Sequence, residues 1–157
     1  MILEILKYPD ERLRTVAEPI NEIDDNVRQK IADMFVTMYH HDGIGLAATQ
    51  VDYHKQLIVM DIEGNALVLI NPEIVSTDGA RKEKEGCLSV PGCFDFVERA
   101  AQVRIKALNE LGNEFTMDAD GLLGACIQHE IDHLNGKVFV DHLSEMKRLR
   151  IRKKLKK

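Results

Sequence analysis

Apolar residues recur at helical spacing in the segment from Asn26 to Asp42. These positions are Val27, Ile31, Met34, Phe35 and Met38. Such spacing is typical of an amphipathic helix that buries one face. Gly43 and Gly45 follow, and glycine commonly ends a helix and opens a loop. The pattern predicts a helix near the start of the chain, followed by a loop.

Short runs with strand-like composition fill the middle of the chain, and their turns carry Gly and Asn. The runs are Leu57–Ile62, Ala66–Ile70, Glu73–Ser76, Phe94–Glu98, Val103–Leu108 and Glu114–Asp118. No internal repeat or linker separates them. We therefore predict several short strands in one continuous domain.

A second helix is predicted from Gly121 to Asn135, with Asp120 as its cap and Gly136 at its end. A last helix begins near Ser144. Strands between helices give an α+β fold, with a mostly antiparallel sheet packed around the helix at 121–135 and with helices at both ends of the chain.

The size and composition describe an ordinary globular protein. The 157 residues suit a single domain, and the sequence is 45% hydrophobic and 30% charged. The N-terminus lacks the basic region and long apolar stretch of a signal peptide, and the three cysteines are too few for a disulfide framework. We expect a cytoplasmic protein and, by default, a monomer.

Charge is unevenly distributed along the chain. Eight Lys or Arg residues and no acidic residue lie between Lys147 and Lys157. Removing these eight charges from the net charge of −5 leaves −13 for residues 1–146. A basic tail at about 144–157 on an acidic body indicates either a polyanionic partner or simply a solvated helix end.

The chemistry centres on His129-Glu130-Ile131-Asp132-His133 in the second predicted helix. Histidines four residues apart project from one helical face, so both rings can reach one metal ion. Glu130 is placed to move a proton on a metal-bound water. Leu122 and Cys126 continue the same stripe, which predicts that it faces inward. The alternative is a pair of satisfied core histidines.

A catalytic metal also needs a third protein ligand. Phe139 stands where the longer protease pattern H-E-x-x-H-x-x-G-x-x-H has its third histidine, which leaves His142 and Glu145 as downstream candidates. Upstream, Cys87 in Glu85–Ser89 offers a thiolate, a strong ligand for zinc or ferrous iron.

Gly43–Gln50 (GIGLAATQ) is the third segment of interest. Its small residues would let an extended peptide lie against the backbone, and Gln50 offers an amide donor. Taken alone, the segment suits a tight crossing from helix to strand equally well.

Together, GIGLAATQ, EGCLS (Glu85–Ser89) and QHEIDHLNG (Gln128–Gly136) resemble the three signatures of the peptide deformylase family, in the same order and each complete. The resemblance is closest to the bacterial form that ends in a C-terminal helix. It implies a hydrolase that removes the N-terminal formyl group from formyl-methionyl nascent polypeptides and releases formate.

The resemblance also implies residue roles. Cys87, His129 and His133 would hold Fe²⁺, with Zn²⁺ or Ni²⁺ able to substitute. Glu130 would carry the proton in catalysis. The Gln50 side chain and the Leu88 backbone N–H would bind the oxyanion.

Substrate contacts follow from the same resemblance. Backbone groups around Ile44 and Gly45 would pair with the peptide as an added strand. Ile44, Leu122, Ala125 and Cys126 would form the methionine pocket. Some relatives carry other residues in place of Phe94 and Ala125. The width of the methionine pocket and the substrate preference at its rim therefore stay open.

The basic C-terminal helix would contact the ribosome. Two rival hypotheses are a zinc endopeptidase with a downstream third ligand and a non-catalytic RNA-binding protein on the same scaffold. Intact catalytic positions favour the deformylase hypothesis over both.

Overall fold

The computed structural model describes residues 1–156, so Lys157, the last residue of the predicted basic tail, lies outside the described residues. Three α-helices are present: α1 (Asp25–His40), α2 (Gly121–Leu134) and α3 (Glu145–Leu155). The strands are β1 (Gly45–Ala47), β2 (Leu57–Ile62), β3 (Asn65–Asp78), β4 (Arg81–Cys87), β5 (Val90–Arg99), β6 (Gln102–Leu108) and β7 (Glu114–Asp120). Short 3₁₀ turns cover Glu11–Arg14, Ala48–Val51 and Phe139–His142.

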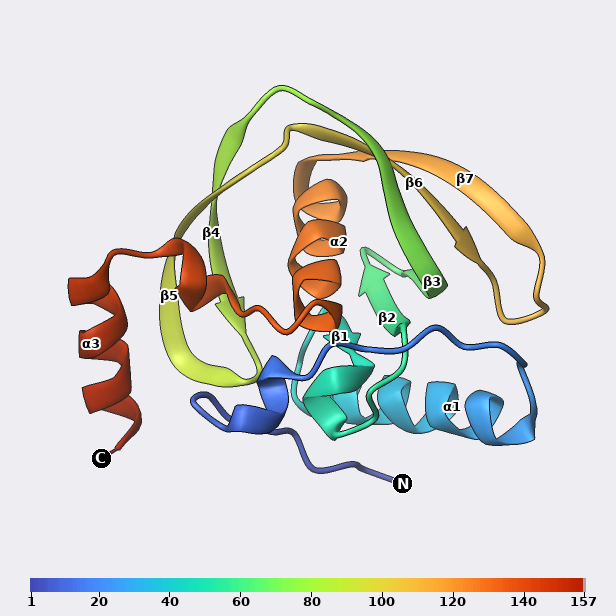
Figure 1. Cartoon of the computed structure of the whole chain (residues 1–157), viewed down its shortest axis with the longest axis horizontal. Coiled ribbons are helices and arrows are strands. Elements are labelled where there is room, and N and C mark those ends of the chain that lie inside the picture. Colours follow the sequence, from blue (N-terminus) through green and yellow to red (C-terminus); the bar gives the residue numbers. More distant parts are fainter. Residues whose placement is uncertain (157) are drawn as a thin grey trace.

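The strands form two antiparallel sheets. Five of them pair in the order β1-β2-β3-β6-β7, and β4 pairs with β5 as a separate hairpin. Helix α2 stands between the hairpin and the larger sheet, with α1 below it and α3 outside β5 (Figure 1). The predicted α+β fold with a central helix is confirmed.

Two predicted strands are one long strand in the structure. We predicted a break between Ala66–Ile70 and Glu73–Ser76 at Asn71-Pro72, but β3 runs through it as 14 residues. Asn71 takes a positive φ of 51°, and the pairing with β6 shifts register between Ile70 and Glu73. A bulge therefore absorbs the residues that disturb the regular pattern.

Two strands escaped prediction. β4 reads RKEKEGC and carries too few apolar residues for a strand signal, since much of it is exposed in a two-stranded hairpin. β1 has only three residues and lies within the segment that we read as a loop. Both strands border the site described below.

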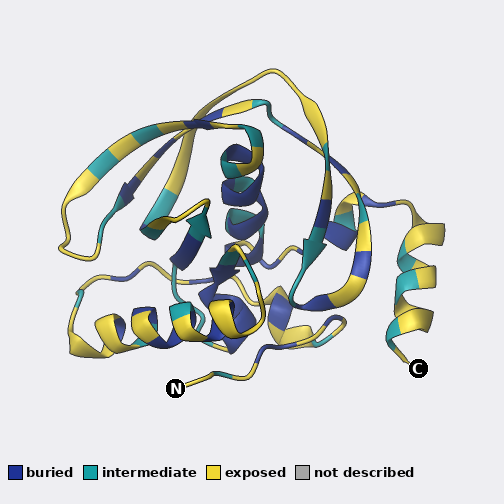
Figure 2. Ribbon diagram, turned by 180° about the vertical axis from the view of Figure 1, so that it is seen from behind, coloured by how far each residue is buried: buried dark blue, intermediate teal, exposed yellow. Residues whose placement is uncertain are grey.

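Helix α2 is buried along most of its length (Figure 2). Asp120 occupies the predicted cap position and also ends β7, but its side chain makes no capping hydrogen bond. Gly136 ends the helical segment as predicted, with φ of +76° and no space for a side chain against Arg14.

Helix α3 begins just after Ser144, whose side chain caps it, as predicted. It has no buried residue, although Ile151 and Leu155 pack partly against the buried cluster that contains Tyr8 and Phe139. Within residues 1–156, no helix has the length and apolar character needed to cross a membrane.

Candidate active site

The structure brings Cys87, His129 and His133 together. One ligand atom from each lies within 4.8 Å of the other two. The histidines project from adjacent turns of α2, with their ring centroids 4.9 Å apart. Cys87 ends β4, where a register shift in the hairpin turns the chain toward α2. The upstream cysteine thus completes the set.

The spacing of these donors fits a tetrahedral metal ion. The Cys87 Sγ and His133 Nε2 atoms are 3.3 Å apart, close to the edge of about 3.5 Å expected for zinc-like bonds of roughly 2.0–2.3 Å. His129 Nδ1 lies 2.8 Å from Glu85 Oε1, which leaves Nε2 as the ligating atom. Two imidazoles and a thiolate suit zinc or ferrous iron.

Protonation of the two histidines differs. Burial lowers the pKa of His133 well below its usual range, which keeps the ring neutral and ready to bind metal. Burial acts to lower the pKa of His129 too, but hydrogen bonds to Cys87 and Glu85 outweigh it and raise that pKa. The two rings therefore differ in their affinity for a proton.

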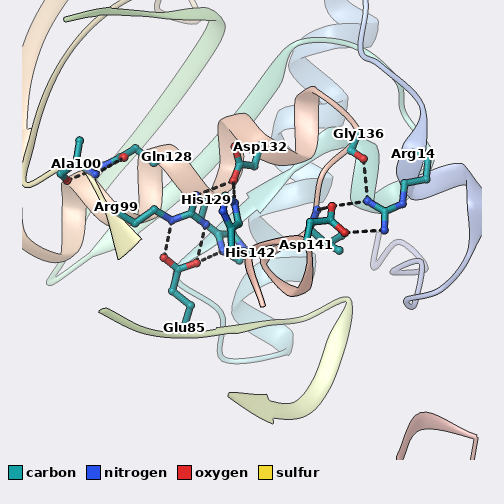
Figure 3. A network of polar contacts seen from close by, with 11 residues as sticks. Arg14, Glu85, Arg99, Ala100, Gln128, His129, Asp132, Gly136, Asp141 and His142 are labelled. Atoms are coloured by element: carbon teal, nitrogen blue, oxygen red, sulfur yellow. Dashed lines mark hydrogen bonds and ion pairs between the residues drawn. The ribbon is translucent and has the colours of Figure 1, made fainter. Parts of the chain in front are cut away.

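A buried charge network holds His129 from behind (Figure 3). Arg99 makes two hydrogen bonds of 2.8 Å to Glu85 and one of 2.6 Å to Asp132. Burial acts to raise the pKa of Glu85, but its bonds to Arg99 and His129 prevail and lower it to about 2. Glu85 is thus ionised and fixes the orientation of the ligand ring.

The downstream candidates for the third ligand are used elsewhere. The His142 Nε2 atom lies 2.9 Å from Asp132 Oδ2, at the outer end of the same network. Phe139 is buried and stacks at 6.2 Å on the His129 ring. Glu145 is exposed at the start of α3. The geometry expected of a zinc endopeptidase of this pattern is therefore missing from residues 1–156.

Glu130 is buried beside the ligand cluster. Its Oε1 atom has no hydrogen-bond partner among the described residues. Burial raises the pKa of this carboxyl to about 7, and the nearby His129 only partly offsets the shift. A carboxyl with a pKa near neutrality can both accept and return a proton.

The glycines before Gln50 make space for the protein's own side chains. A β-carbon on Gly45 would lie 2.7 Å from Glu130 Oε2 and 2.8 Å from Cys126 Sγ. A β-carbon on Gly43 would lie 2.8 Å from Leu88 Cδ1. The tight-crossing interpretation of this segment is thus correct locally, and it leaves Glu130 against the backbone of β1.

Gln50 is buried and held at both ends of its amide. The Oε1 atom accepts from Ala47 N at 3.0 Å, which turns the Nε2 group toward the site. This group donates to Ser89 Oγ at 3.0 Å and to Cys87 Sγ at 3.4 Å. The side chain therefore presents a fixed donor next to the ligand cluster.

A cleft of about 670 Å³ leads from the surface to this cluster. Ala125 and Cys126 are buried in its wall, and burial raises the pKa of the Cys126 thiol. The prediction that Leu122 faces inward is wrong. Leu122 lies at the cleft mouth and is 51% exposed. Ile44, at 43% exposed, stands at the same mouth.

Strand β1 is an edge strand, so one of its sides is open. Asp61 N donates to the Ile44 carbonyl at 2.9 Å, which makes that pair the hydrogen-bonded one. Since backbone groups alternate in direction, the N–H and C=O of Gly45 point to the open side. An extended peptide could pair there.

Sequence reasoning assigned no role to Glu85 or Arg99. Glu85 belongs to the EGCLS segment, and its position two residues before a ligand was a usable signal. Arg99 ends β5 and lies in no motif, so only the hairpin pairing that sets it beside α2 reveals it.

Comparisons with known proteins agree with this geometry. A model of the family described as polypeptide deformylase matches residues 2–149. A peptide deformylase of Neisseria meningitidis is 57% identical, over 99% of this chain and 95% of the relative. The crystal structure of a Legionella pneumophila peptide deformylase superposes with a TM-score of 0.97 at 50% identity, over 99% of this chain and 94% of that one. A peptide deformylase of Ehrlichia chaffeensis, solved in complex with actinonin, gives 0.95 at 43% identity, over 99% and 96%.

Proposed function

Because this chain belongs to the polypeptide deformylase family, and so removes N-terminal formyl groups from nascent peptides, we propose that its reaction takes place at Cys87, His129 and His133. The observation that carries this proposal is the convergence of the three ligand atoms beside the buried Glu130. A metal dependence is general to the family.

The protein's own groups account for the proton transfers. Glu130 takes a proton from the water that attacks the formyl carbon. It then gives that proton to the nitrogen as the C–N bond breaks, which releases formate and a free amine. The Gln50 Nε2 group and the Leu88 backbone N–H donate to the oxygen on which negative charge develops.

We propose Fe²⁺ as the metal, with Zn²⁺ or Ni²⁺ able to substitute. When bound, such an ion supplies Lewis-acid polarisation and lowers the pKa of a coordinated water toward roughly 7. Metal analysis of protein purified without oxygen checks the assignment. Stoichiometric zinc and no iron in that preparation would contradict it.

The peptide would lie between β1 and β4 with its methionine side chain in the cleft. Gly45 would supply the backbone pairing, and Ile44 and Leu122 would close the mouth over the thioether. Ala125 and Cys126 would form the inner wall. An apolar wall with a thiol suits a flexible sulfur-containing side chain.

The deciding experiment measures formate release from a formyl-methionyl tripeptide by anaerobically prepared, ferrous-loaded protein. The acetylated peptide is the control. We expect formyl-selective release that a chelator abolishes and added metal restores. Release by Cys87→Ala at the wild-type rate would show that the metal centre lies elsewhere.

We also propose that the enzyme is a cytoplasmic monomer of one catalytic domain and that α3 contacts the ribosome. Three basic residues of α3 attach the helix to the body: Lys147 to Asp95, Arg152 to the Tyr8 hydroxyl and Lys154 to the Gly92 carbonyl. Lys153 and Lys156 are exposed, in a position where they can meet rRNA phosphates.

Ribosome co-sedimentation tests the partner. Lys153→Glu with Lys156→Glu should weaken binding, and the wild-type interaction should weaken as salt increases. Lys82→Glu, an exposed charge change on β4, is the matched control. Deleting the residues after Met146 should have the same effect as the double reversal. Equal sedimentation of all variants would rule out the contact.

A further inference from the structure

We propose that Phe94 forms a selective wall for the substrate, which favours an aromatic or aliphatic side chain at residue 2 or 3 of the formylated chain. This inference rests on the proposed position of the peptide between β1 and β4. It concerns the part of the substrate that follows the methionine.

Phe94 is exposed but held in place. Its side chain is 64% exposed, yet it lines the cleft that contains Cys87, His129 and Glu130. A β-carbon on Gly86, the cross-strand partner of Phe94, would lie 2.4 and 2.5 Å from two carbons of the ring. The ring therefore lies on the backbone of Gly86, in space that only glycine leaves free.

The position of Gly86 determines which residue of the substrate lies beside the Phe94 ring. Gly86 directly precedes the ligand Cys87, and an extended chain advances about 3.3 Å per residue. A peptide that leaves the ligand cluster along β4 passes the Phe94 ring one or two residues after its methionine. Phe96, on the same exposed face, lies two residues farther from the cluster.

The surrounding residues leave Phe94 as the main apolar contact on this side. Glu83, Lys84 and Glu85 of β4 line the cleft with charged side chains, and Phe94 is the largest apolar side chain that the hairpin contributes. An exposed aromatic ring next to a reaction centre gains most from an apolar neighbour that covers it. Because the Phe94 ring lines the same cleft as the reaction centre, we infer that the substrate, and not a second protein, covers the ring.

The test compares kcat/KM for two pairs of peptides, formyl-Met-Phe-Ala with formyl-Met-Ser-Ala and formyl-Met-Ala-Phe with formyl-Met-Ala-Ser. At one of the two positions, wild-type protein should prefer Phe roughly five-fold, which is the scale for half-covering an aromatic side chain. The preference should reside in KM, because the contact is the same in the ground and transition states.

Phe94→Ala should reduce that ratio to within two-fold, and Phe94→Arg should shift the preference toward Asp at the same position. Leu111→Ala, which truncates an exposed leucine in the β6–β7 turn, is the matched control and should keep the wild-type ratio. Melting curves of all variants check that the fold persists.

An unchanged Phe-to-Ser ratio in Phe94→Ala would overturn the proposal. So would an equal loss for both peptides, since that pattern would indicate damage to the common site. If wild-type protein releases formate from the Ser peptides, the proposed function stands whatever the ratio shows. If it releases none from any peptide, the proposed function fails and this inference fails with it.

Discussion

Helices α2 and α3 both carry charged residues, but they place them in opposite surroundings. Eight of the 14 residues of α2 are buried, and they include His129, Glu130 and His133. None of the 11 residues of α3 is buried. Figure 2 shows the contrast between a dark central helix and a largely exposed terminal one.

The difference shows that surroundings decide what a charged side chain can do. In α2, burial raises the pKa of Glu130 to about 7, so that the carboxyl can exchange a proton near neutral pH. In α3, the cations lie at the surface, where the contacts of Lys147, Arg152 and Lys154 with the body stabilise the fold little. We therefore propose a role in chemistry for the interior charges and in contact with a partner for the surface charges.

Glu130→Gln tests the chemical part of this comparison and should have the largest effect. It keeps the size of the buried side chain but removes the proton acceptor, so kcat should fall by about 10²–10⁴-fold. Metal content should stay at one ion per chain, because Glu130 is not a ligand. Metal analysis together with formate release separates this outcome from collapse of the site.

Arg99→Leu should show how strongly the charge network around Glu85 and Asp132 depends on the Arg99 cation. It leaves the buried Glu85 without Arg99 and leaves the partly buried Asp132 with His142 alone, so the free energy of unfolding should fall by about 3–5 kcal/mol. Metal affinity should fall about 10–100-fold, because Glu85 then orients His129 poorly. Denaturant titrations and metal competition measure the two effects.

The matched control is Arg104→Leu, which removes an exposed ion pair with Asp118. Its stability should change by less than about 1 kcal/mol. Similar losses in Arg99→Leu and Arg104→Leu would remove the distinction between interior and surface charge.

Gly45→Ala should place an extra carbon of β1 against the Glu130 side chain of α2. The added carbon would lie 2.7 Å from Glu130 Oε2, and such overpacking costs about 1–3 kcal/mol. We expect reduced kcat and a lower melting temperature. In Gly64→Ala, the new carbon meets nothing within 4 Å, so any loss there reflects backbone strain at φ of +84° and turnover should persist.

The pH profile of kcat/KM tests the raised pKa of Glu130. The carboxyl accepts a proton only when ionised, so activity should rise with pH and fall about tenfold per unit on the acid side. The pKa near 7 comes from burial, and a bound cation lowers it, so the midpoint should lie between about pH 4.5 and 7. A midpoint above 7 would contradict this assignment.

Removing α3 should have the smallest effect on catalysis. Deletion of the residues after Met146 exposes the cluster beneath Ile151 and Leu155, which should cost about 1–2 kcal/mol of stability. Turnover of a short peptide should stay within two-fold, since no α3 residue lines the cleft. A tenfold loss would show that the two helices do not act separately.

Local patterns were enough to predict the regular helices and the two candidate histidine ligands. The spacing of Val27, Ile31 and Met34 identified α1, and the pair His129 and His133 identified the face of α2 that carries the chemistry. The helices and the histidine pair are therefore encoded by neighbouring residues. Cys87 alone was only one candidate, and its role came from the family resemblance that the three segments carry together.

Local patterns could not predict the features that depend on pairing between distant segments of the chain. Strand β4 has too few apolar positions to be recognised alone, and its partner β5 defines it. Arg99 acquires its role only when that hairpin packs beside α2. Leu122 continues an inward stripe by spacing, but the cleft opens at that point and leaves it half exposed.

In the proposed binding mode, the open side of β1 selects substrates by the backbone conformation of their N-terminal end. A peptide that pairs with Gly45 must have its own backbone N–H and C=O groups free, as an extended strand does. A chain end already wound into a helix has used those groups internally. The proposed pairing at this open edge of the sheet would thus restrict the enzyme to polypeptide ends that have not yet folded, and it would place the reaction before folding.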